Sequence, residues 1–520
     1  MTEPPSRLTA EEELVDEGAR STDDLTQAAA EGLRWIAYAR VIIEVVLFAS
    51  AVVLARMMPP SAFGIFAVIV IVQELAVTMP MEGVGGALVQ RKTLSREHLE
   101  AGLALTVLTG LALAALTVLI AIVLVRPLFD HTTEILVIAQ APFFLMGAIF
   151  AVPISVLRRR LDFRRVSIVE TLQNTTRVLA TIGLALLGLD APALVFGCTI
   201  GMAVGLVAAL VYAPVPLPRW RGKAVRDLLP YGGPAALATF AWTGFRNGDY
   251  AVIGSVLGPN AAGLYWRGYQ LAVEYQGKVA VPMVQMAFPV LARTEGTKEL
   301  LGLRRRMVHL QTVVLFPLLV VLLVLAPVVV PWLFGSAWEG AVVPTQILVA
   351  GGAASLVINA AGSALMAEGR AKALLGYGIA HFVVYVGAVV AVAHMGLAAV
   401  AIAGSVVHGV FLAVAYVVLL GRREGNPLMA LWRDLAPALW GSAALAAVAV
   451  PLELALRDGG APVLLQMAAV GLTGGIAYVA ALRWLFPAAA HDLLAALNRV
   501  SPVRLGLRRG RGATPAGAKA

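Results

Sequence analysis

Apolar and polar positions follow one another along this chain in long blocks, not in a short alternation. Each apolar block is about twenty residues long, the length that an α-helix needs to cross the hydrocarbon core of a bilayer. Short segments rich in Gly, Pro or Arg separate the blocks. The pattern predicts an all-α integral membrane protein with about 14 transmembrane helices. These are expected at residues 33–56, 62–88, 99–125, 134–157, 167–188, 190–213, 229–257, 261–291, 307–334, 340–367, 370–394, 396–420, 431–456 and 461–486.

Basic residues are concentrated in every second loop between the apolar blocks. One set of loops holds 22 Lys and Arg residues, whereas the other set holds only Arg56, Arg126 and Arg457. Cytoplasmic loops of membrane proteins carry the excess of positive charge. The sequence therefore predicts a multi-pass protein of the bacterial inner (plasma) membrane with both termini in the cytoplasm, which an even number of spans allows.

The composition excludes a soluble fold. Apolar residues make up 59% of the chain and charged residues only 14%, against roughly 25% charged residues in soluble domains. The net charge of +9 does not indicate a nucleic-acid partner, because the basic residues lie in loops between membrane helices. The one cysteine, Cys198, excludes a disulfide framework and a cysteine-based zinc site.

The chain contains an internal repeat. The segment 60–66 (PSAFGIF) follows the first span, and 259–265 (PNAAGLY) follows the seventh. Likewise 126–129 (RPLF) follows the third span and 331–334 (PWLF) the ninth. Six spans separate the copies, so both halves have the same orientation in the membrane. This predicts two parallel six-helix bundles, related by an axis along the membrane normal, plus two extra C-terminal helices.

This organisation divides the chain into six parts. The first is acidic and lacks the basic start and apolar middle of a signal peptide. The last is basic and is expected near anionic lipid headgroups. In order, the parts are a disordered acidic cytoplasmic tail (1–32), the N-terminal bundle (33–214), a cytoplasmic linker (215–228), the C-terminal bundle (229–421), two additional transmembrane helices (422–486), and an interfacial helix with a basic cytoplasmic tail (487–520).

Several short blocks recur along the chain in a characteristic order and spacing. The blocks are 87–92 (ALVQRK) with 97–99 (EHL), 157–163 (LRRRLDF) with Glu170, 247–249 (NGD) with 257–259 (LGP) and 263–265 (GLY), 288–291 (FPVL), and 333–338 (LFGSAW). Together they resemble the blocks of polysaccharide flippases of the lipopolysaccharide-biosynthesis type (O-antigen and exopolysaccharide flippases), within the multidrug/oligosaccharidyl-lipid/polysaccharide exporter superfamily. The resemblance covers roughly residues 30–425.

The resemblance implies a transporter for cell-surface polysaccharide biosynthesis. It would flip an undecaprenyl-diphosphate-linked oligosaccharide from the inner to the outer leaflet by alternating access. Its expected partners are this polyprenyl-diphosphate-linked glycan and membrane lipids. A coupling ion, either a proton or sodium, and a polysaccharide polymerase machinery are left open as further partners. No nucleic acid, metal or cofactor is expected.

Three other functions remain as alternatives. A lipid II flippase and a drug/cation antiporter belong to the same superfamily, although the blocks above favour its polysaccharide branch. A membrane glycan polymerase or ligase is disfavoured, because the outward loops are only a few residues long. The chain also has no phosphate-binding loop, zinc-protease motif or nucleophile elbow. We therefore expect a transporter and not an enzyme, with no catalytic residues.

Ionisable residues inside the predicted spans point to a substrate cavity. A charged side chain at the centre of the bilayer costs about 2.5–3.5 kcal/mol on insertion scales, so such residues are expected to face water or a partner. They concentrate in the first, second, fifth, seventh and eighth spans, and the resemblance implies that the first, second, seventh and eighth line the central cavity. The candidate substrate-binding residues are Arg40, Glu44, Glu74, Glu170, Arg177, Arg246, Asp249, Glu274 and Lys278.

Two interpretations of these residues stay open. In the first, the cations bind the diphosphate, for which arginine offers paired donors, and the carboxylates bind sugars or coupling ions. In the second, residues three, four or seven apart on one helix face merely neutralise each other. Such sets are Arg40 with Glu44, Glu170 with Arg177, and Arg246 with Asp249. A further cation, Arg267, lies near a predicted outer boundary and is expected to snorkel towards water.

Overall fold

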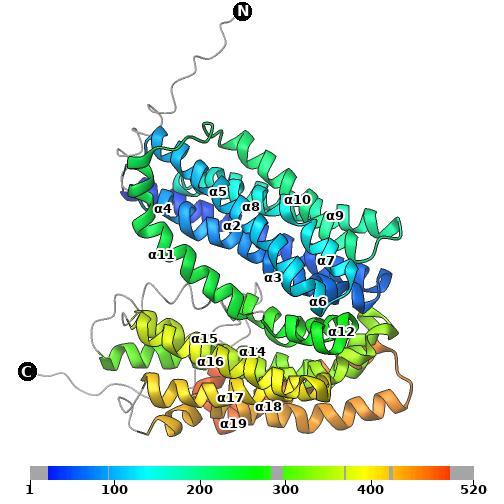
Figure 1. Cartoon of the computed structure of the whole chain (residues 1–520). Helices are drawn as coiled ribbons and strands as arrows, with labels where there is room; N and C mark the ends of the chain where they lie inside the picture. Colours follow the sequence, from blue (N-terminus) through cyan, green and yellow to red (C-terminus); the bar gives the residue numbers. More distant parts are fainter. Residues whose placement is uncertain are drawn as a thin grey trace, which may run out of the picture. The chain divides into compact units, whose positions relative to one another are not determined.

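We analysed a computed structural model of the chain. It describes residues 22–91, 93–246, 248–280, 297–367, 370–420 and 426–491, together with residues 283 and 493. Within these residues the secondary structure is entirely helical (Figure 1), which confirms the predicted fold class. The α-helices are α2 (Thr22–Met57), α3 (Pro60–Pro80), α4 (Gly86–Gln90), α5 (Arg96–Ile120), α6 (Arg126–Leu128), α7 (His131–Ile138), α8 (Ala141–Arg159), α9 (Phe163–Leu186), α10 (Ala191–Tyr212), α11 (Gly222–Arg246), α12 (Gly248–Tyr269), α14 (Thr297–Phe334), α15 (Val342–Ala367), α16 (Ala371–Val392), α17 (Leu397–Val414), α18 (Pro427–Asp458) and α19 (Val463–Leu485).

Short π and 3-10 segments extend several of these helices. A π turn, η2 (Met81–Gly85), joins α3 to α4, and η3 (Ala121–Val125) joins α5 to α6. The predicted second and third spans are therefore continuous helices, and each contains one π-helical turn. The remaining segments of this kind are η4 (Gln270–Glu274), η5 (Ser336–Ala341), η6 (Ala393–Met395) and η7 (Ala415–Leu420).

Ten helical segments of the described chain are long and apolar enough to cross a membrane. Four long helices do not meet that test, namely α2, α9, α11 and α12. They match the predicted first, fifth, seventh and eighth spans, and they carry most of the candidate cavity residues. The protein is thus a multi-pass membrane protein, and the count of fourteen spans remains a prediction.

Local sequence signals explain many of the helix ends. Asp130 and Asp162 precede α7 and α9, and each side chain accepts a hydrogen bond from a backbone N–H of the first turn. Proline occupies the first turn of α3, α8 and α10, where its missing N–H costs nothing. The tight connection from α9 to α10 contains Gly188, whose φ of 82° favours glycine.

Three predicted boundaries differ from the structure. Helix α2 begins at Thr22, within the segment 1–32 that was expected to be a disordered tail. Helix α11 begins at Gly222, inside the predicted linker 215–228. It ends at Arg246, whereas the predicted seventh span runs on to residue 257. Both α2 and α11 begin before their apolar stretch. The apolar pattern predicts only the part of each helix that lies in the lipid.

The predicted turn between the seventh and eighth spans is present inside α12. Gly258 has φ 84° and ψ 169°, so two helical pieces meet there at a kink. Pro259 follows and starts the second piece. The segment 487–520, predicted to be an interfacial helix with a basic tail, lies mostly outside the described residues. The 288–291 block and the chain before Thr22 lie outside them entirely.

Contacts between residues divide the chain into two compact units. Unit 1 contains residues 1–270, 327–348 and 378–407, and unit 2 contains 271–326, 349–377 and 408–520. This division does not follow the two predicted bundles, because unit 1 holds the first bundle together with parts of the second. The predicted domain boundaries therefore stay a prediction.

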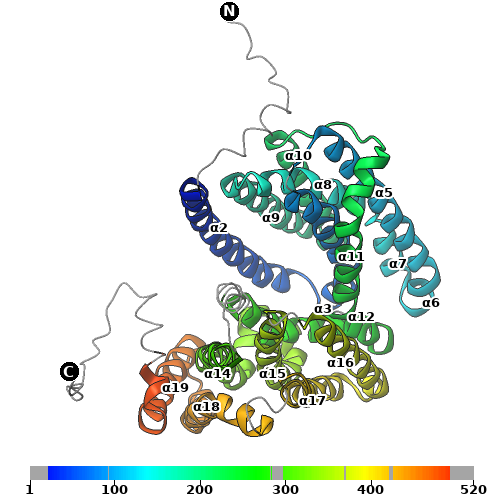
Figure 2. The ribbon, with the colours of Figure 1, turned by 90° about the vertical axis from the view of Figure 1, so that its left-hand side faces the viewer.

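Within unit 1, the helices of the first predicted bundle pack on one another. Helix α9 lies along α10, α5 packs on α8, and α2 packs on α9. Helices α11 and α12 also pack on α3 and its extension η2, although both belong to the second repeat by sequence. Figure 2 shows α9, α8 and α10 side by side within this unit.

Within unit 2, the two extra helices α18 and α19 form an antiparallel hairpin (Figure 1). Tyr478 of α19 donates a hydrogen bond of 2.7 Å to the backbone oxygen of Val313 on α14. Gly441 of α18 lies against the ring of the same tyrosine. The hairpin is thus attached to the part of α14 that belongs to this unit.

Candidate functional site

The two copies of the repeat meet at one place in unit 1. A Cβ atom added to Gly64 would lie 1.7 Å from the backbone oxygen of Pro259, and one added to Gly263 would lie 1.8 Å from that of Pro60. These contacts are reciprocal, since each repeat glycine touches the proline that starts the other copy. The relation is the one expected for two parallel halves about a twofold axis. Only glycine allows α3 and α12 to approach so closely.

A buried arginine lies next to this crossing. Arg267 is 1% exposed, and its guanidinium carbon is 4.8–5.7 Å from the centres of four aromatic rings. The side chain of Gln270 accepts a hydrogen bond from its Nη1 at 3.0 Å. The expectation that Arg267 snorkels to water is therefore wrong, because aromatic faces attract the cation inside the protein. The four rings belong to Phe63, Trp266, Phe334 and Trp338.

Three further hydrogen bonds tie the end of α2 to the end of α14 and to η5, which follows it. The indole Nε1 of Trp338 donates to the backbone oxygen of Ala55 at 2.8 Å. Arg56 donates to the backbone oxygens of Leu333, at 2.9 Å, and Trp332. We call these hydrogen bonds, the crossing at Gly64 and Gly263, and Arg267 with its four aromatic rings the outer clamp. The predicted topology places this clamp on the outer side of the membrane. A cavity of about 460 Å³ adjoins it, lined by residues 55–59 and 334–337.

Asp249 lies in a cluster of tyrosines in unit 1. Its carboxylate is buried and accepts a hydrogen bond of 2.7 Å from the hydroxyl of Tyr385 on α16. The hydroxyls of Tyr385 and Tyr265 are 3.3 Å apart, and the rings of Tyr250 and Tyr269 pack against Tyr265. The sequence indicated Asp249 as a site residue but not its hydroxyl donor Tyr385, because that residue comes from the distant helix α16.

The predicted seam on α9 is divided between two environments. Glu170 pairs with Arg158 of α8, at 3.3 Å, and not with Arg177. Arg177 instead is hydrogen-bonded to the thiol of Cys198 on α10. Glu170 and Arg177 lie seven residues, or two helical turns, apart on α9. In the structure these two residues do not neutralise each other, because Glu170 pairs with Arg158.

The other candidate residues are spread over both units. Arg40 and Glu44 form an ion pair of 3.1 Å on α2, and the Arg40 side chain is 65% exposed. Glu74 is half-buried on α3. Lys278 belongs to unit 2, where its Nζ lies 4.9 Å from the ring centre of Tyr275.

Two candidates add little to this picture. Glu274 is half-buried in unit 2, within η4. The side chain of Arg246 lies outside the described residues. Seven of the nine candidates thus belong to unit 1 and two to unit 2, so a single cavity that contains all of them remains a prediction.

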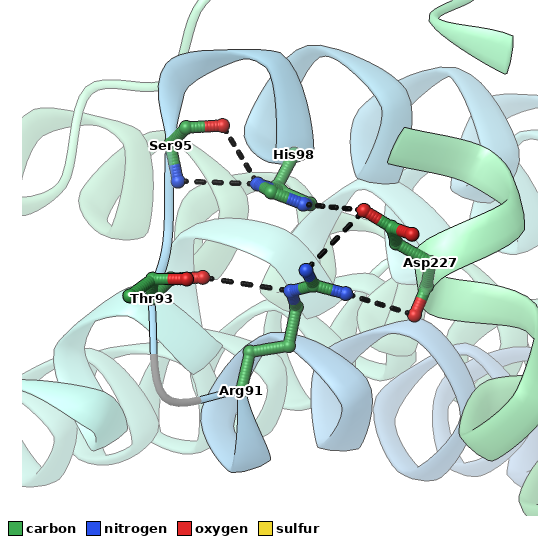
Figure 3. Close-up of polar contacts among 5 residues, drawn as sticks. All are labelled: Arg91, Thr93, Ser95, His98 and Asp227. Atoms are coloured by element: carbon green, nitrogen blue, oxygen red, sulfur yellow. Dashed lines mark hydrogen bonds and ion pairs between the residues drawn. The ribbon is translucent and has the colours of Figure 1, made fainter. Parts of the chain in front are cut away.

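A polar network on the predicted cytoplasmic side was not expected from the sequence. Arg91 donates to both the backbone oxygen and the carboxylate of Asp227 on α11, at 3.0 and 3.3 Å (Figure 3). The ring of His98 lies between Ser95 and the same carboxylate. The backbone oxygen of Thr93 accepts from Arg91. The loop after α4 is thereby joined to the start of α11.

A second ion pair strengthens this junction. Glu100 of α5 accepts a hydrogen bond of 2.9 Å from Arg221, which precedes α11. The Glu100 carboxylate raises the pKa of the Arg221 guanidinium further above its ordinary value. Arg96 also pairs with Glu100, at 3.4 Å. The sequence placed Arg96 and Arg221 in loops, and only the fold reveals that both meet Glu100.

Unit 2 contains a buried ion pair that the sequence analysis also missed. Arg304 of α14 and Asp434 of α18 have fully buried side chains, with 3.4 Å between Nη2 and Oδ2. The hydroxyl of Tyr416 donates to the same carboxylate oxygen at 3.1 Å. Arg305 binds the other oxygen at 3.1 Å. Asp434 thus links α18, the first extra helix, to Arg304 of α14. In the sequence, Arg304 indicates only the orientation in the membrane.

Among the residues that the structure describes, no group of three or more His, Cys, Asp and Glu side chains could hold a metal ion. The chemistry of the candidate residues is that of ion pairing and hydrogen bonding. Such groups can hold an anion or a sugar but form no recognisable nucleophile and base pair.

Sequence comparison identifies the family. Residues 53–343, more than half of the chain, match the family model described as polysaccharide biosynthesis protein. The chain belongs to this family. It is also similar to an uncharacterised membrane protein in the cps region of Klebsiella pneumoniae, with 22% identity over 68% of this chain and 74% of that protein. The similarity to the lipopolysaccharide biosynthesis protein WzxC of Escherichia coli is 26% over 66% of this chain and 71% of WzxC. The resemblance found in the sequence is thereby confirmed.

Solved structures confirm the fold of this polysaccharide biosynthesis protein. An inward closed conformation of the lipid II flippase MurJ superposes with a TM-score of 0.66 over 86% of this chain and 99% of MurJ, at 14% identity. An inward-facing multidrug resistance transporter of the MATE family gives a TM-score of 0.59 over 76% of this chain and 99% of that chain, at 15% identity. At these identities the similarity concerns the fold.

Proposed function

We propose that this polysaccharide biosynthesis protein moves a polyprenyl-diphosphate-linked oligosaccharide from the inner to the outer leaflet of the bacterial inner membrane by alternating access. The family supports a polysaccharide pathway. The fold is one that membrane transporters use. A chain with this fold and family moves a glycan on its lipid carrier, because a free sugar chain has no membrane anchor to keep it at the bilayer.

The observation that carries the proposal is the reciprocal contact of the two repeats at Gly64 and Gly263. A transporter of two parallel halves works by closing one end of the central site while the other end is open. The outer clamp is such a closure, since it joins the repeats through a few side chains next to a glycine crossing. In the opposite state these contacts would separate and release the glycan outwards.

The membrane potential supports transport in this direction. A diphosphate is negatively charged, and moving one charge through 100 mV is worth about 2.3 kcal/mol. The inside-negative potential of a bacterial cell therefore favours export of the headgroup. A coupled proton or sodium ion would add to this force. Asp249, a buried carboxylate with a tyrosine donor, is the residue that we would examine first for such coupling.

Transport into sealed vesicles tests the function. Inverted inner-membrane vesicles would be loaded with a radiolabelled prenyl-diphosphate oligosaccharide in the outer, formerly cytoplasmic, leaflet. With the protein present, the glycan should become protected from an added glycosidase, and collapse of the membrane potential should slow this protection. A glycan that stays accessible while lipid II becomes protected would overturn the proposal in favour of a lipid II flippase. Transport of a cationic dye alone would overturn it in favour of a drug antiporter.

A further inference from the structure

A basic, proline-rich segment joins the two sequence repeats. Residues 213–221 (APVPLPRWR) run from the end of α10 to the start of α11 without helical structure (Figure 1). Prolines at 214, 216 and 218 fix their own φ and restrict the residue before each of them to extended backbone. The chain therefore cannot continue α10 as a helix and stays extended over the protein. We call residues 213–221 the surface segment.

Two contacts with Glu100 hold the surface segment against α5. The backbone N–H of Arg219 donates to the backbone oxygen of Glu100 at 3.2 Å. The guanidinium of Arg221 donates at 2.9 Å to the Glu100 carboxylate, whose side chain is only 4% exposed. Since these two arginines flank Trp220, the tryptophan is presented from a fixed backbone. The surface segment is thus held in place on unit 1 and is not a free connection.

Two large apolar side chains of the surface segment are exposed. Leu217 is 79% exposed and Trp220 is 61% exposed. They are three residues apart, and an extended chain of the polyproline type has three residues per turn, so both lie on the same side of the segment. Lipid normally covers such side chains on membrane helices, but this pair lies beyond the last residue of the apolar helix α10. The pair is thus an apolar surface outside the membrane-spanning helices.

Exposed cations flank this apolar pair in the sequence. Arg219 belongs to the surface segment, and Lys223 and Arg226 lie three residues apart on the first turns of α11. All three are exposed, and none of them forms an ion pair among the described residues. On the same turns Val225 and Leu228 are buried. The start of α11 therefore has an apolar face towards the protein and a basic face away from it.

We propose that the surface segment, together with Lys223 and Arg226, binds the anionic lipid headgroups of the cytoplasmic leaflet. Tryptophan is enriched where membrane and water meet, because its ring is apolar and its N–H is polar. Each Lys or Arg close to an anionic leaflet adds electrostatic attraction to it. The surface segment and the start of α11 combine both features on a backbone that is already fixed.

The position of the surface segment favours lipid over a soluble partner. Helix α10 is apolar enough to cross the membrane and ends at Tyr212. Five residues of extended chain, at about 3.1 Å each, keep Leu217 within about 16 Å of that end. The predicted topology places this end of α10 at the cytoplasmic leaflet, where anionic lipids attract basic segments. The apolar pair is therefore close enough to reach the headgroups.

Fluorescence quenching in reconstituted vesicles tests the proposal on the full-length protein. Leu217→Cys is labelled with an environment-sensitive fluorophore, and the buried Cys198 of the wild type gives the labelling background. The vesicles contain phosphatidylcholine alone or with phosphatidylglycerol, and a lipid spin-labelled at its headgroup is the quencher. We expect quenching that increases with phosphatidylglycerol and falls at high salt, because salt screens exposed charges. A label at Trp220→Cys should respond in the same way.

Leu187→Cys is the matched control. Leu187 is 77% exposed and lies in the turn from α9 to α10, on the predicted outer side. The nearest charged residue in the sequence is Asp190, so no cation flanks it. A label at this position should respond equally in both lipid mixtures and at both salt concentrations.

Removal of the cations separates their role from that of the apolar pair. In the labelled Leu217→Cys protein, Lys223→Gln should raise the phosphatidylglycerol content needed for half of the quenching by about fivefold. Arg219→Gln, Lys223→Gln and Arg226→Gln together should abolish the dependence on phosphatidylglycerol. The unfolding temperature of this triple variant in phosphatidylcholine should not change, because none of the three is in an ion pair among the described residues.

Three outcomes would overturn the proposal. Equal quenching at Leu217 in both lipid mixtures would mean apolar contact without a preference for anionic lipid. Absence of quenching in both mixtures would place the surface segment in water, where a soluble partner could bind it. A response to phosphatidylglycerol that is as large at Leu187, or that survives in the triple variant, would assign the effect to the bilayer as a whole.

Discussion

Arginines within the membrane helices are stabilised in different ways in this protein. Arg267 is surrounded by aromatic rings, and Arg304 is paired with a buried carboxylate. Arg177 has neither an aromatic ring nor a carboxylate as a partner among the described residues, and its stem packs against Gly201 of α10. Since a buried cation without a counter-charge is costly, the first two are best explained as structural. The third is the better candidate for a ligand.

The buried carboxylate of Asp249 accepts a hydrogen bond of 2.7 Å from the hydroxyl of Tyr385. Replacement by Tyr385→Phe would leave a buried acceptor without that donor, which costs about 1–3 kcal/mol. We expect a lower thermal unfolding temperature and slower vesicle transport. The control is Tyr377→Phe on the same helix, which removes a hydroxyl bonded to the backbone oxygen of Phe411. Equal transport by the two variants would show that the Asp249 cluster has no role in transport.

Arg246 tests the two interpretations of the seventh span. If it binds substrate, Arg246→Ala should accumulate in the membrane but lose export, and Arg246→Lys should recover only part, because an ammonium lacks the bidentate fork. If Arg246 only neutralises Asp249, the double variant Arg246→Ala with Asp249→Ala should restore export. Full export by that double variant would contradict a binding role. The measurements are membrane abundance and surface polysaccharide.

The sequence could identify charged residues inside the membrane but not their partners. Spacing on one helix correctly paired Arg40 with Glu44, since residues four apart are neighbours. It failed for Glu170, whose partner Arg158 comes from the preceding helix. The hydroxyl donor of Asp249 and three of the four rings around Arg267 come from segments far away in the sequence, and no local pattern contains that information.

Among the helices, the close crossing of α3 and α12 depends on the smallest side chain. Most helix positions were predictable, because an apolar stretch of membrane length can only be a helix. The start of α2 was not, since a helix can continue into water without any apolar signal. The glycine crossing follows from a repeat visible in the sequence, but the contact between the copies required the fold.

The crossing yields a prediction for Gly64→Ala and Gly263→Ala. Each added methyl would meet a backbone oxygen at less than 2 Å, so the outer clamp could close only with a shift of a helix. We expect a lower unfolding temperature and loss of transport in both variants. Gly183→Ala is the control, because no atom lies within 4 Å of the added carbon. Normal transport by Gly64→Ala would show that the crossing is not required.

The buried pair of Arg304 and Asp434 yields a prediction for the extra helices. Asp434→Ala would leave Arg304 buried without its carboxylate, and breaking such a pair typically costs about 3–5 kcal/mol. The unfolding temperature should fall clearly below that of Asp458→Ala, which removes an exposed carboxylate at the other end of α18. A double replacement, Arg304→Met with Asp434→Leu, should recover much of the loss. Equal stability of the two single variants would contradict a structural role.

For the whole molecule, the repeat and the charge pattern place different constraints on the protein. The repeat requires that both halves have the same orientation, and the reciprocal glycine contact agrees with it. The charge pattern determines which end faces the cytoplasm. Transport direction depends on this orientation, because the outer clamp closes the outward side only if the basic loops lie inside.

The last prediction is therefore the topology. A difference of 22 against 3 basic residues should place the loop after α8 in the cytoplasm and the turns before α7 and after α18 outside. A reporter fused at Arg160 should read as internal, and reporters at Asp130 and Asp458 as external. Asp130 and Arg160 lie between helices and Asp458 is the last residue of α18, so a fusion at each leaves the preceding helices intact. An internal signal at Asp130 would reverse the orientation, make the outer clamp an inner one, and require export to begin from the opposite state.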